Sequence, residues 1–451
     1  MLSRKQTLAY GVADVAGSTS YNTINVHLLF FLVTVLGLNP ALAGSVLLVG
    51  RVIDAFTDPL MGVLSDRFKV RLGSRLVFVR YGMIPFGLSF ALIWFLTPQA
   101  SEWQLFALAA ILLTLHTTIF TVVQVSYLAT TPDLAPSYQA RTVLTSYRVA
   151  FATLASLLAT ALPPLLASQI ALLLPGLNPT LVGWRGVGIL FGIIMVLSFL
   201  PLVTLITEPK TTTSASGFSN LRDIVQRLLR TRGYPQVVLI FVLATLGIGI
   251  VASMLPFYLD SALRLTADQA TVALGVLFIA AALSMPLWTY LAKKWDKARA
   301  LCCGAGVLAV SLVLVTQLPL PAGISLPFAL LALAAGMGLG AVLLFPWAML
   351  PDTVTATSNT ATSHETSSGD QSGLLYACFS LAQKTSFAIG VFANGQVLAR
   401  AGFDPELATQ STDAINAIQT MVGPVAACCF VLMGYAAWCY PLRADDVDTS
   451  A

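Results

Sequence analysis

Long apolar segments follow one another along the whole chain, and short polar segments separate them. Each apolar segment is about as long as the ~20 residues that an α-helix needs to cross the hydrocarbon core of a membrane. The pattern predicts twelve spanning helices, over residues 8–37, 41–65, 75–97, 102–131, 140–168, 185–206, 236–262, 267–292, 299–319, 323–350, 372–399 and 413–440. The expected fold class is therefore an all-α membrane protein.

A long polar segment follows the sixth expected helix and separates the first six helices from the last six. It is rich in Ser, Thr and Gly over 211–217, and 218–232 has the pattern of a basic amphipathic helix that lies on a membrane surface. Two sets of six helices are typical of transporters built from repeated halves. We predict an N-terminal half, a cytoplasmic linker, a C-terminal half and a cytoplasmic tail, over 1–207, 208–235, 236–440 and 441–451 respectively.

Composition and charge agree with a membrane location. Of the 451 residues, 57% are hydrophobic and 10% are charged, whereas soluble domains carry about 25% charged residues. Eighteen of the 24 Lys and Arg residues fall on one expected side of the membrane and three on the other, which places both termini in the cytoplasm by the positive-inside rule. Topology thus accounts for the basic residues, and no nucleic-acid partner is expected. The chain has no Asn-x-Ser/Thr glycosylation acceptor, which favours a bacterial inner membrane.

Two carboxylates, Asp54 and Asp58, lie in the middle of the apolar second helix. A spacing of four residues puts both side chains on one helical face. Charged groups at membrane depth are costly, and they are kept mainly where they face a cavity or a partner. The pair therefore predicts a site for a cation, either Na⁺ or a proton, because two carboxylates that repel each other also favour protonation of one of them. The structural alternative is a buried ion-pair network in which Arg51 or Lys384 neutralises the pair.

The chain resembles a family of symporters. Residues 51–62, Arg-Val-Ile-Asp-Ala-Phe-Thr-Asp-Pro-Leu-Met-Gly, and the following loop with Ser65-Asp66-Arg67 and Arg75 resemble a signature of the glycoside–pentoside–hexuronide:cation symporters, the melibiose permease-like branch of the major facilitator superfamily. Similar segments are found at Tyr10–Asp14, Ser126–Leu128, Pro346–Asp352 and Gln383–Lys384. The resemblance implies the major facilitator fold and cation-coupled symport, in which rocking of the halves exposes a central cavity to each side in turn.

The resemblance also implies roles for individual residues. In the family, carboxylates of helix 2 and a threonine of helix 4 bind the coupling cation, and the matching positions are Asp54, Thr57, Asp58 and Thr121, with Na⁺ expected at Asp54 and Asp58. Arg148 matches an arginine that contacts substrate. Gln124 and Ser18 stand where melibiose permease has sugar-binding carboxylates, and Asp14 lies one turn before Ser18 on the same face.

The remaining substrate-contact candidates are Asn22, on the polar face of helix 1, the aromatic residues Tyr127 and Trp347, and Lys384. Lys384 lies far from either expected end of its helix, so a central role between the halves is expected rather than a side chain that reaches the membrane surface. Asp66, Arg67 and Arg75 match a superfamily motif that clamps helix ends in one conformation and releases them in the other, so they are gating candidates. Asp352 is their counterpart in the second half. Ordinary solvation of a loop is the alternative for all four.

The expected activity is transport of a small organic solute of the sugar or glycoside type. The helix 2 and helix 10 segments are also similar to animal sodium-dependent lysophospholipid transporters, so transport of an amphipathic lipid is the alternative. An enzyme is not expected, because there is no nucleophile–base pair and the three histidines, His27, His116 and His364, are scattered. A non-transporting receptor is disfavoured by the intact Asp54, Asp58 and Lys384. We expect a monomer in contact with membrane lipid, with no cofactor besides the coupling ion.

Overall fold

The computed structural model describes residues 3–99, 101–135, 138–174, 178–207, 233–317, 324–360, 368–407 and 409–441. Throughout these residues the regular structure is helical. The chain divides into two compact units, the first made of Met1–Ser216 with Asp404–Ala408 and the second of Gly217–Phe403 with Thr409–Ala451. The expected surface helix over 218–232 lies outside the described residues, as does all of the expected tail except Pro441. The expected domain boundaries stay a prediction.

The helices of the first unit follow the six expected spans. They are α1 (Arg4–Phe30), continued by the π-helix η1 (Phe31–Val35), α2 (Pro40–Leu72), α3 (Leu76–Trp94), α4 (Glu102–Leu128), α5 (Thr131–Leu134), α6 (Tyr138–Ala161), α7 (Pro163–Leu173) and α8 (Pro179–Leu205). The expected fifth span, 140–168, is divided between α6 and α7, because Pro163 and Pro164 lack the N–H groups that would continue the helix.

The second unit contains the other six spans. Its helices are α10 (Tyr234–Phe257), continued by η2 (Tyr258–Ala262), α11 (Ala267–Trp295), α12 (Lys297–Gln317), α13 (Leu326–Thr360), α14 (Ser368–Arg400), α15 (Thr412–Thr420), η3 (Met421–Val425) and α16 (Ala426–Trp438). Two helices outlast their apolar spans: α2 continues to Leu72 and α13 to Thr360. Hydropathy marks where contact with lipid ends, whereas backbone hydrogen bonds can continue a helix into water.

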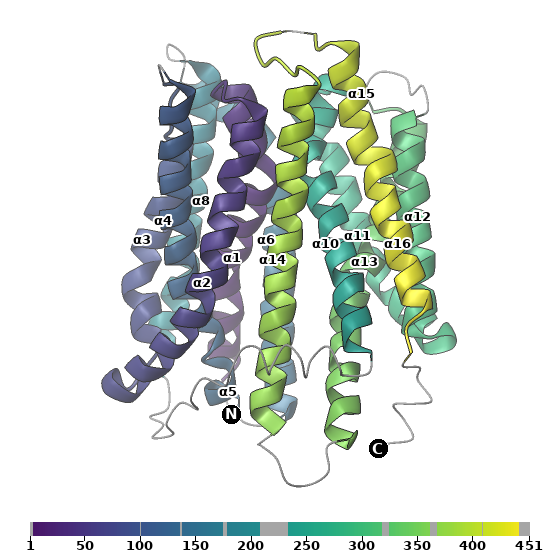
Figure 1. The fold of residues 1–451 in the computed structure, drawn as a ribbon. Coiled ribbons are helices and arrows are strands. Elements are labelled where there is room, and N and C mark those ends of the chain that lie inside the picture. The colour runs from purple at the N-terminus through teal and green to yellow at the C-terminus, as the bar shows by residue number, and fades with distance from the viewer. Residues whose placement is uncertain are drawn as a thin grey trace. The chain divides into compact units, whose positions relative to one another are not determined.

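Both units have the same internal packing. In the first, α1 packs against α6 and α8, α3 against α4 and α8, and α2 against α4 (Figure 1). In the second, α10 packs against α14 and α16, α12 against α13 and α16, and α11 against α13. If the six spans of each unit are counted in chain order, these pairings are identical. The two units therefore share the same six-helix arrangement, although their sequences differ.

Most helices can face lipid, but α1 is different. Among the described residues, nine helices are long and apolar enough to cross a membrane, and α1 is not one of them. Its polar side chains are turned into the unit, where Asp14, Ser20, Asn25 and His27 are buried. In contrast, α3 exposes an apolar stripe at a spacing of three or four residues, formed by Tyr81, Ile84, Leu88 and Leu92. The first unit thus puts a polar helix inside and apolar side chains outside.

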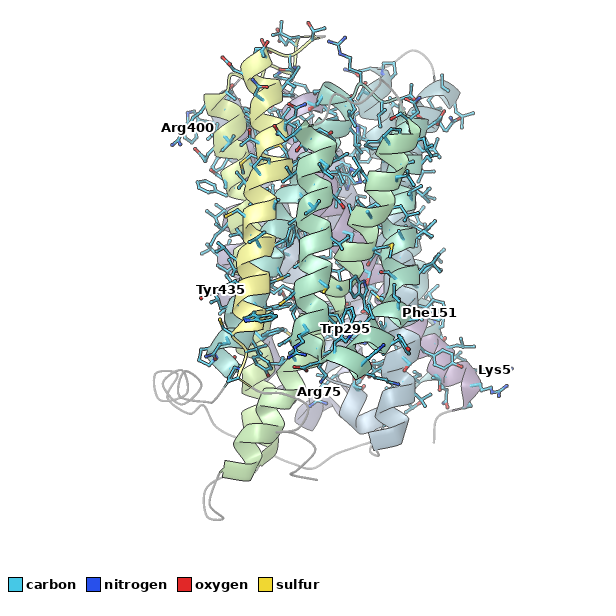
Figure 2. The ribbon with its side chains drawn as sticks, turned by 90° about the vertical axis from the view of Figure 1, so that its right-hand side faces the viewer. Lys5, Arg75, Phe151, Trp295, Arg400 and Tyr435 are labelled. Carbon is cyan, nitrogen blue, oxygen red and sulfur yellow. The ribbon has the colours of Figure 1, made fainter. Side chains whose placement is uncertain are left out.

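Basic residues that the sequence assigns to opposite sides of the membrane lie at opposite ends of the second unit. Arg400, at the end of α14, and Trp295, which follows Lys293 and Lys294 on α11, lie at opposite ends of this unit (Figure 2). The exposed Tyr435 of α16 lies between these levels (Figure 2). This separation fits the distribution of Lys and Arg along the sequence. Which end faces the cytoplasm stays a prediction.

A turn of unusual shape ends the first spanning helix of each unit. After η1, the amide of Leu36 donates to the carbonyl of Phe31 at 3.1 Å, and that of Leu38 donates to Leu32 at 2.9 Å. After η2, Leu263 donates to Tyr258 at 3.0 Å and Leu265 to Leu259 at 2.9 Å. The residue between the two leucines has a positive φ in both turns, 72° at Gly37 and 52° at Arg264. The same turn therefore has a glycine in one unit and a strained arginine in the other.

Relief of this strain should stabilise the second unit. A non-glycine residue in the left-handed region costs about 1–2 kcal/mol, so Arg264→Gly should raise the midpoint of thermal unfolding in detergent. Arg264→Ala removes the charge but keeps the side-chain strain, and it should give no comparable rise. Gly37→Ala, at the matching position, should lower the midpoint. A lower midpoint for Arg264→Gly than for the parent protein would contradict this explanation.

Candidate functional site

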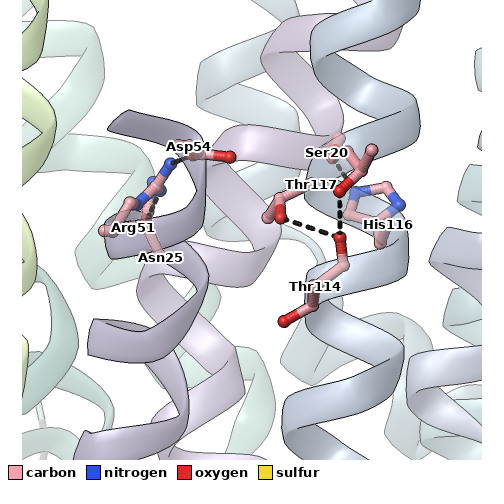
Figure 3. A network of polar contacts seen from close by, with 8 residues as sticks. Ser20, Asn25, Arg51, Asp54, Thr114, His116 and Thr117 are labelled. Atoms are coloured by element: carbon pink, nitrogen blue, oxygen red, sulfur yellow. Dashed lines mark hydrogen bonds and ion pairs between the residues drawn. The ribbon is translucent and has the colours of Figure 1, made fainter. Parts of the chain in front are cut away.

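An ion pair joins two residues of α2 close to the expected cation site. The Asp54 side chain is 1% exposed, and its Oδ2 lies 3.0 Å from Nη1 of Arg51, three residues earlier. The second terminal nitrogen of Arg51 donates to Oδ1 of Asn25 on α1 at 2.8 Å, and its guanidinium lies over the ring of Tyr21 at 5.2 Å. Arg51 therefore neutralises Asp54 and ties α2 to α1 (Figure 3).

Within the described part of the structure, two side-chain oxygens of this stretch of α2 have no hydrogen-bond partner. They are Asp54 Oδ1 and the buried Oγ1 of Thr57, one turn further along the same face of α2. Gly50 of α2 lies against Leu113 and Thr117 of α4, and the two helices run in the same direction. One turn further along, Asp54 is therefore level with Thr117 and Thr121, and Thr121 is buried. Carboxylate and hydroxyl oxygens are the ligands that hard cations prefer.

The structure leaves part of the expected cation site undescribed. Asp58 belongs to the backbone of α2, but its side chain lies outside the described part of the structure. Within the described part there is no group of three or more His, Cys, Asp or Glu residues that could hold a metal ion. A cation at Asp54 would therefore depend on hydroxyl oxygens, or on Asp58, for its other ligands.

A cavity adjoins the ion pair inside the first unit. It lies between α1, α2 and α4 and has a volume of about 20 Å³, which is room for about one water molecule. Its polar lining includes Ser20, Asn25, Arg51, Asp54 and His116, and Phe120 is part of its apolar wall.

His116 of α4 links three helices beside this cavity, a role that the sequence pattern did not reveal. The side chain is 1% exposed. Its Nε2 lies 2.7 Å from Ser20 Oγ on α1 (Figure 3), and its Nδ1 lies 3.0 Å from Ser89 Oγ on α3. The ring is stacked on Phe86 at 5.2 Å. In the sequence, the only signal for this role is an ionisable residue inside a spanning helix.

Three of the expected substrate residues form a second cluster in the first unit. Gln124 Nε2 donates to Asp14 Oδ1 at 2.7 Å, and Tyr127 OH donates to the carbonyl of Tyr10 at 2.7 Å. The Gln124 amide reaches Asp14 because it packs directly on Gly17, where an added Cβ would be only 2.7 Å from Oε1. The carboxyl of Asp14 and the amide of Gln124 thus meet between α1 and α4.

Other expected residues of the first unit take different positions. Asn22 donates to the carbonyl of Ser18 at 2.8 Å and to Ser156 Oγ of α6 at 2.9 Å, so its amide holds α1 against α6. Arg148 is a half-buried residue of α6, and its charge interacts with the carboxyl group of Asp14 in the second cluster. Neither contact joins Ser18 or Asn22 to the cluster of Asp14 and Gln124.

Two expected substrate residues belong to the second unit. Trp347 of α13 is part of an aromatic group, with ring centroids 5.1 Å from Phe241 and 5.3 Å from Phe379. Lys384 is a half-buried residue of α14.

Of the four gating candidates, Arg75 is the one whose side chain the structure describes. Its Nη1 donates to the carbonyl of Ala129, just past the end of α4, at 3.0 Å, where helix carbonyls are unpaired and the helix dipole is negative. Lys297 joins the same two spans in the second unit, because its Nζ donates to the carbonyl of Ala348 at 3.1 Å, but Ala348 lies within α13 and not past its end. Lys297 was missed, although it begins the third span of its half as Arg75 precedes the third span of the first. The side chains of Asp66, Arg67 and Asp352 lie outside the described part of the structure.

Comparison with known proteins identifies the family. The family described as MFS/sugar transport protein matches residues 9–444. The inner membrane symporter YicJ of Escherichia coli is 28% identical over 96% of this chain and 90% of its own. The isoprimeverose transporter of Lactiplantibacillus pentosus is 25% identical over 93% and 85%, and the sodium-dependent lysophosphatidylcholine symporter 1-A of Danio rerio is 23% identical over 91% and 80%.

A solved structure shows the same fold. The inward-facing, unoccupied form of a bacterial homologue of the human lysosomal transporter Spinster superposes with a TM-score of 0.71 at 13% identity, over 98% of this chain and 100% of that chain. The predicted fold class and the predicted family resemblance are therefore confirmed. The chain is an integral, multi-pass membrane protein with the major facilitator fold, and it belongs to the MFS/sugar transport protein family.

Proposed function

We propose that this protein couples the movement of Na⁺ or a proton to the uptake of a sugar or glycoside by alternating access. The observation that carries the proposal is the carboxylate of Asp54, which is buried in a spanning helix and paired through Oδ2 with Arg51, while its Oδ1 has no partner among the residues that the structure describes. A purely structural ion pair gains nothing from an unpaired buried oxygen, because an acceptor without a partner costs free energy. In a cation site, that oxygen would serve as a ligand of the cation.

Coupling follows from competition for Asp54. A cation bound by Asp54, Thr57, Asp58 and Thr121 weakens the attraction between Asp54 and Arg51. Arg51 also holds Asn25 of α1, so the cation changes how α1 and α2 are tied together. A ligand shifts a conformational equilibrium only by its difference in affinity for the two states, and this change of partners supplies such a difference. Arg75, with Asp66, Arg67 and Asp352, then holds or releases the helix ends.

The hydrogen-bonding groups near α1 favour a hydroxylated solute. Asp14 and Gln124 bring a carboxyl and an amide together, and such groups bind hydroxyls. Ser18, Asn22, Tyr127, Arg148, Trp347 and Lys384 are the further candidates for contact with the solute. Relatives include both an isoprimeverose transporter and a lysophosphatidylcholine symporter, so a sodium-dependent lipid transporter is the second candidate. We place the protein in a bacterial inner membrane as a monomer, with both termini in the cytoplasm and no cofactor besides the ion.

Loss of the Asp54 charge should uncouple transport. In proteoliposomes, Asp54→Asn should reduce uptake driven by a Na⁺ or proton gradient at least about tenfold, which corresponds to a loss of about 1.4 kcal/mol in cation binding. Asp260→Asn, at an exposed position in η2 of the second unit, is the control and should leave gradient-driven uptake unchanged. Uptake by Asp54→Asn that keeps its full response to the gradient would refute the coupling site.

The class of substrate can be read from ligand-induced stabilisation. Methyl glycosides of glucose, galactose and xylose, together with lysophosphatidylcholine, should be compared by thermal shift with and without Na⁺ at several pH values. We expect at least one glycoside to stabilise the protein, and Gln124→Leu to reduce that shift because the amide that donates to Asp14 is lost. Stabilisation by lysophosphatidylcholine alone would favour the lipid transporter instead.

A further inference from the structure

Basic residues are concentrated where α11 meets α12, at the expected cytoplasmic end of the second unit. The helix α11 ends at Trp295 and α12 begins at Lys297, so a single residue separates them. Over residues 293–299 the chain has four basic side chains and one acidic side chain, which leaves a net charge of +3: Lys293, Lys294, Asp296, Lys297 and Arg299. These charges are therefore held at the ends of two adjacent helices.

Three of the four basic side chains have no protein partner in the part of the chain that the structure describes. Lys297 is engaged, because its Nζ donates to the carbonyl of Ala348. Asp296 is engaged too, since its Oδ1 accepts from the backbone N–H of Lys297 at 2.7 Å. The other three are exposed and make no ion pair or hydrogen bond with a described residue: Lys293, Lys294 and Arg299. An anion at this place would meet cations that these residues do not neutralise.

Lys294 lies at the end of an exposed apolar stripe on α11. Leu283, Leu287 and Tyr290 are exposed at intervals of three or four residues, so they share one face of the helix with Lys294. From Leu283 to Lys294 this face is about 16 Å long at a rise of 1.5 Å per residue, which is about half of the ~30 Å hydrocarbon core of a membrane. The stripe is thus long enough for one leaflet, with the ammonium group at the level of the headgroups.

Arg299 lies at the start of a similar stripe on α12. Cys303, Val307 and Val310 are exposed at intervals of three or four residues on the face that Arg299 begins. From Arg299 to Val310 this stripe is as long as the one on α11. Each of the two helices therefore has apolar side chains over the depth of one leaflet and a cation where that leaflet ends.

Lipid is the occupant that matches both features of this surface. A soluble anion would pair with the cations but leave the apolar stripes uncovered, whereas acyl chains that cover the stripes put their own headgroup level with Lys294 and Arg299. A net charge of +3 attracts an anionic headgroup, and it repels the ammonium group of a zwitterionic one. Trp295 is 42% exposed at the end of the unit opposite Arg400 (Figure 2), and Trp is enriched at the level of lipid headgroups.

We propose that the ends of α11 and α12 beside Asp296 form a binding site for an anionic phospholipid. Its acyl chains lie along the two apolar stripes, and its phosphate is held between Lys294 and Arg299, with Lys293 beside them. The site is separate from the proposed transport function, because it uses none of the residues assigned to the ion, to the solute or to gating. Either proposal can therefore fail without the other.

The test measures the binding of individual lipids to the detergent-purified protein by native mass spectrometry. The parent protein should bind phosphatidylglycerol more tightly than phosphatidylethanolamine with the same acyl chains. The double variant Lys294→Gln and Arg299→Gln should bind phosphatidylglycerol about thirtyfold more weakly, since each basic side chain beside an anionic headgroup contributes about fivefold. The matched control is Arg4→Gln with Lys5→Gln, which removes two exposed basic charges from the first unit and should leave this binding unchanged.

Cys303 reports where the lipid binds. This exposed thiol lies one turn beyond Arg299 on the same face of α12, whereas Cys428 is an exposed thiol of α16. Saturating phosphatidylglycerol should protect Cys303, but not Cys428, from alkylation by a maleimide, as read by peptide mass spectrometry. The protection should be lost in the double variant. If the double variant does not fold, protection of Cys303 in the parent protein decides alone.

Several outcomes would overturn the proposal. Equal binding of the two lipids by the parent protein would show that the headgroup is not recognised, and an equal loss in the control with Arg4 and Lys5 changed would show attraction by net charge alone. Displacement of the lipid by an equal concentration of glycerol phosphate would identify a soluble phosphate as the occupant. If phosphatidylglycerol is preferred only after Asp445, Asp446 and Asp448 are changed to Asn, the chain's own acidic segment takes the cations instead.

Discussion

A charge inside a membrane protein has to be balanced, and the balance between Asp54 and Arg51 is the constraint on which the first unit depends. Removal of one partner from a buried pair leaves an uncompensated charge, typically at a cost of about 3–5 kcal/mol. Here the balance extends over two helices, because Arg51 also binds Asn25 and covers the ring of Tyr21. The cavity, the unpaired oxygen of Asp54 and the polar face of α1 all adjoin this pair.

The pair also connects the proposed cation site to the polar face of α1. Asp54 offers its free oxygen both to the expected cation site and to the cavity lined by Ser20 and Asn25. A change of partner at Asp54 would therefore alter the contact that Arg51 makes with Asn25 of α1. His116 acts on the same cavity from α4 through Ser20. Thus a few hydrogen bonds join α1, α2 and α4 around the proposed cation site within one unit.

The sequence predicted what depends on local pattern. Runs of apolar residues placed the spans, and the spacing of Asp54 and Asp58 put both on one face of α2. Partners far apart in the chain were beyond that pattern: His116 meets Ser20 across 96 residues and Ser89 across 27. Similarly, Lys297 joins the same two spans as Arg75 only because the two units share the same six-helix arrangement. The break at Pro163 was visible in the sequence, but hydropathy alone does not detect it.

The central claim is that Arg51 and the coupling cation compete for Asp54. The most direct measurement is titration of cation binding to the purified protein without solute, by calorimetry for Na⁺ and by proton uptake for H⁺, with Arg51→Gln and Asp54→Asn beside the parent protein. We predict tighter cation binding by Arg51→Gln, because its competitor is gone, and loss of binding by Asp54→Asn. If Arg51→Gln weakened cation binding as much as Asp54→Asn, the two would not compete, and this account of coupling would be contradicted.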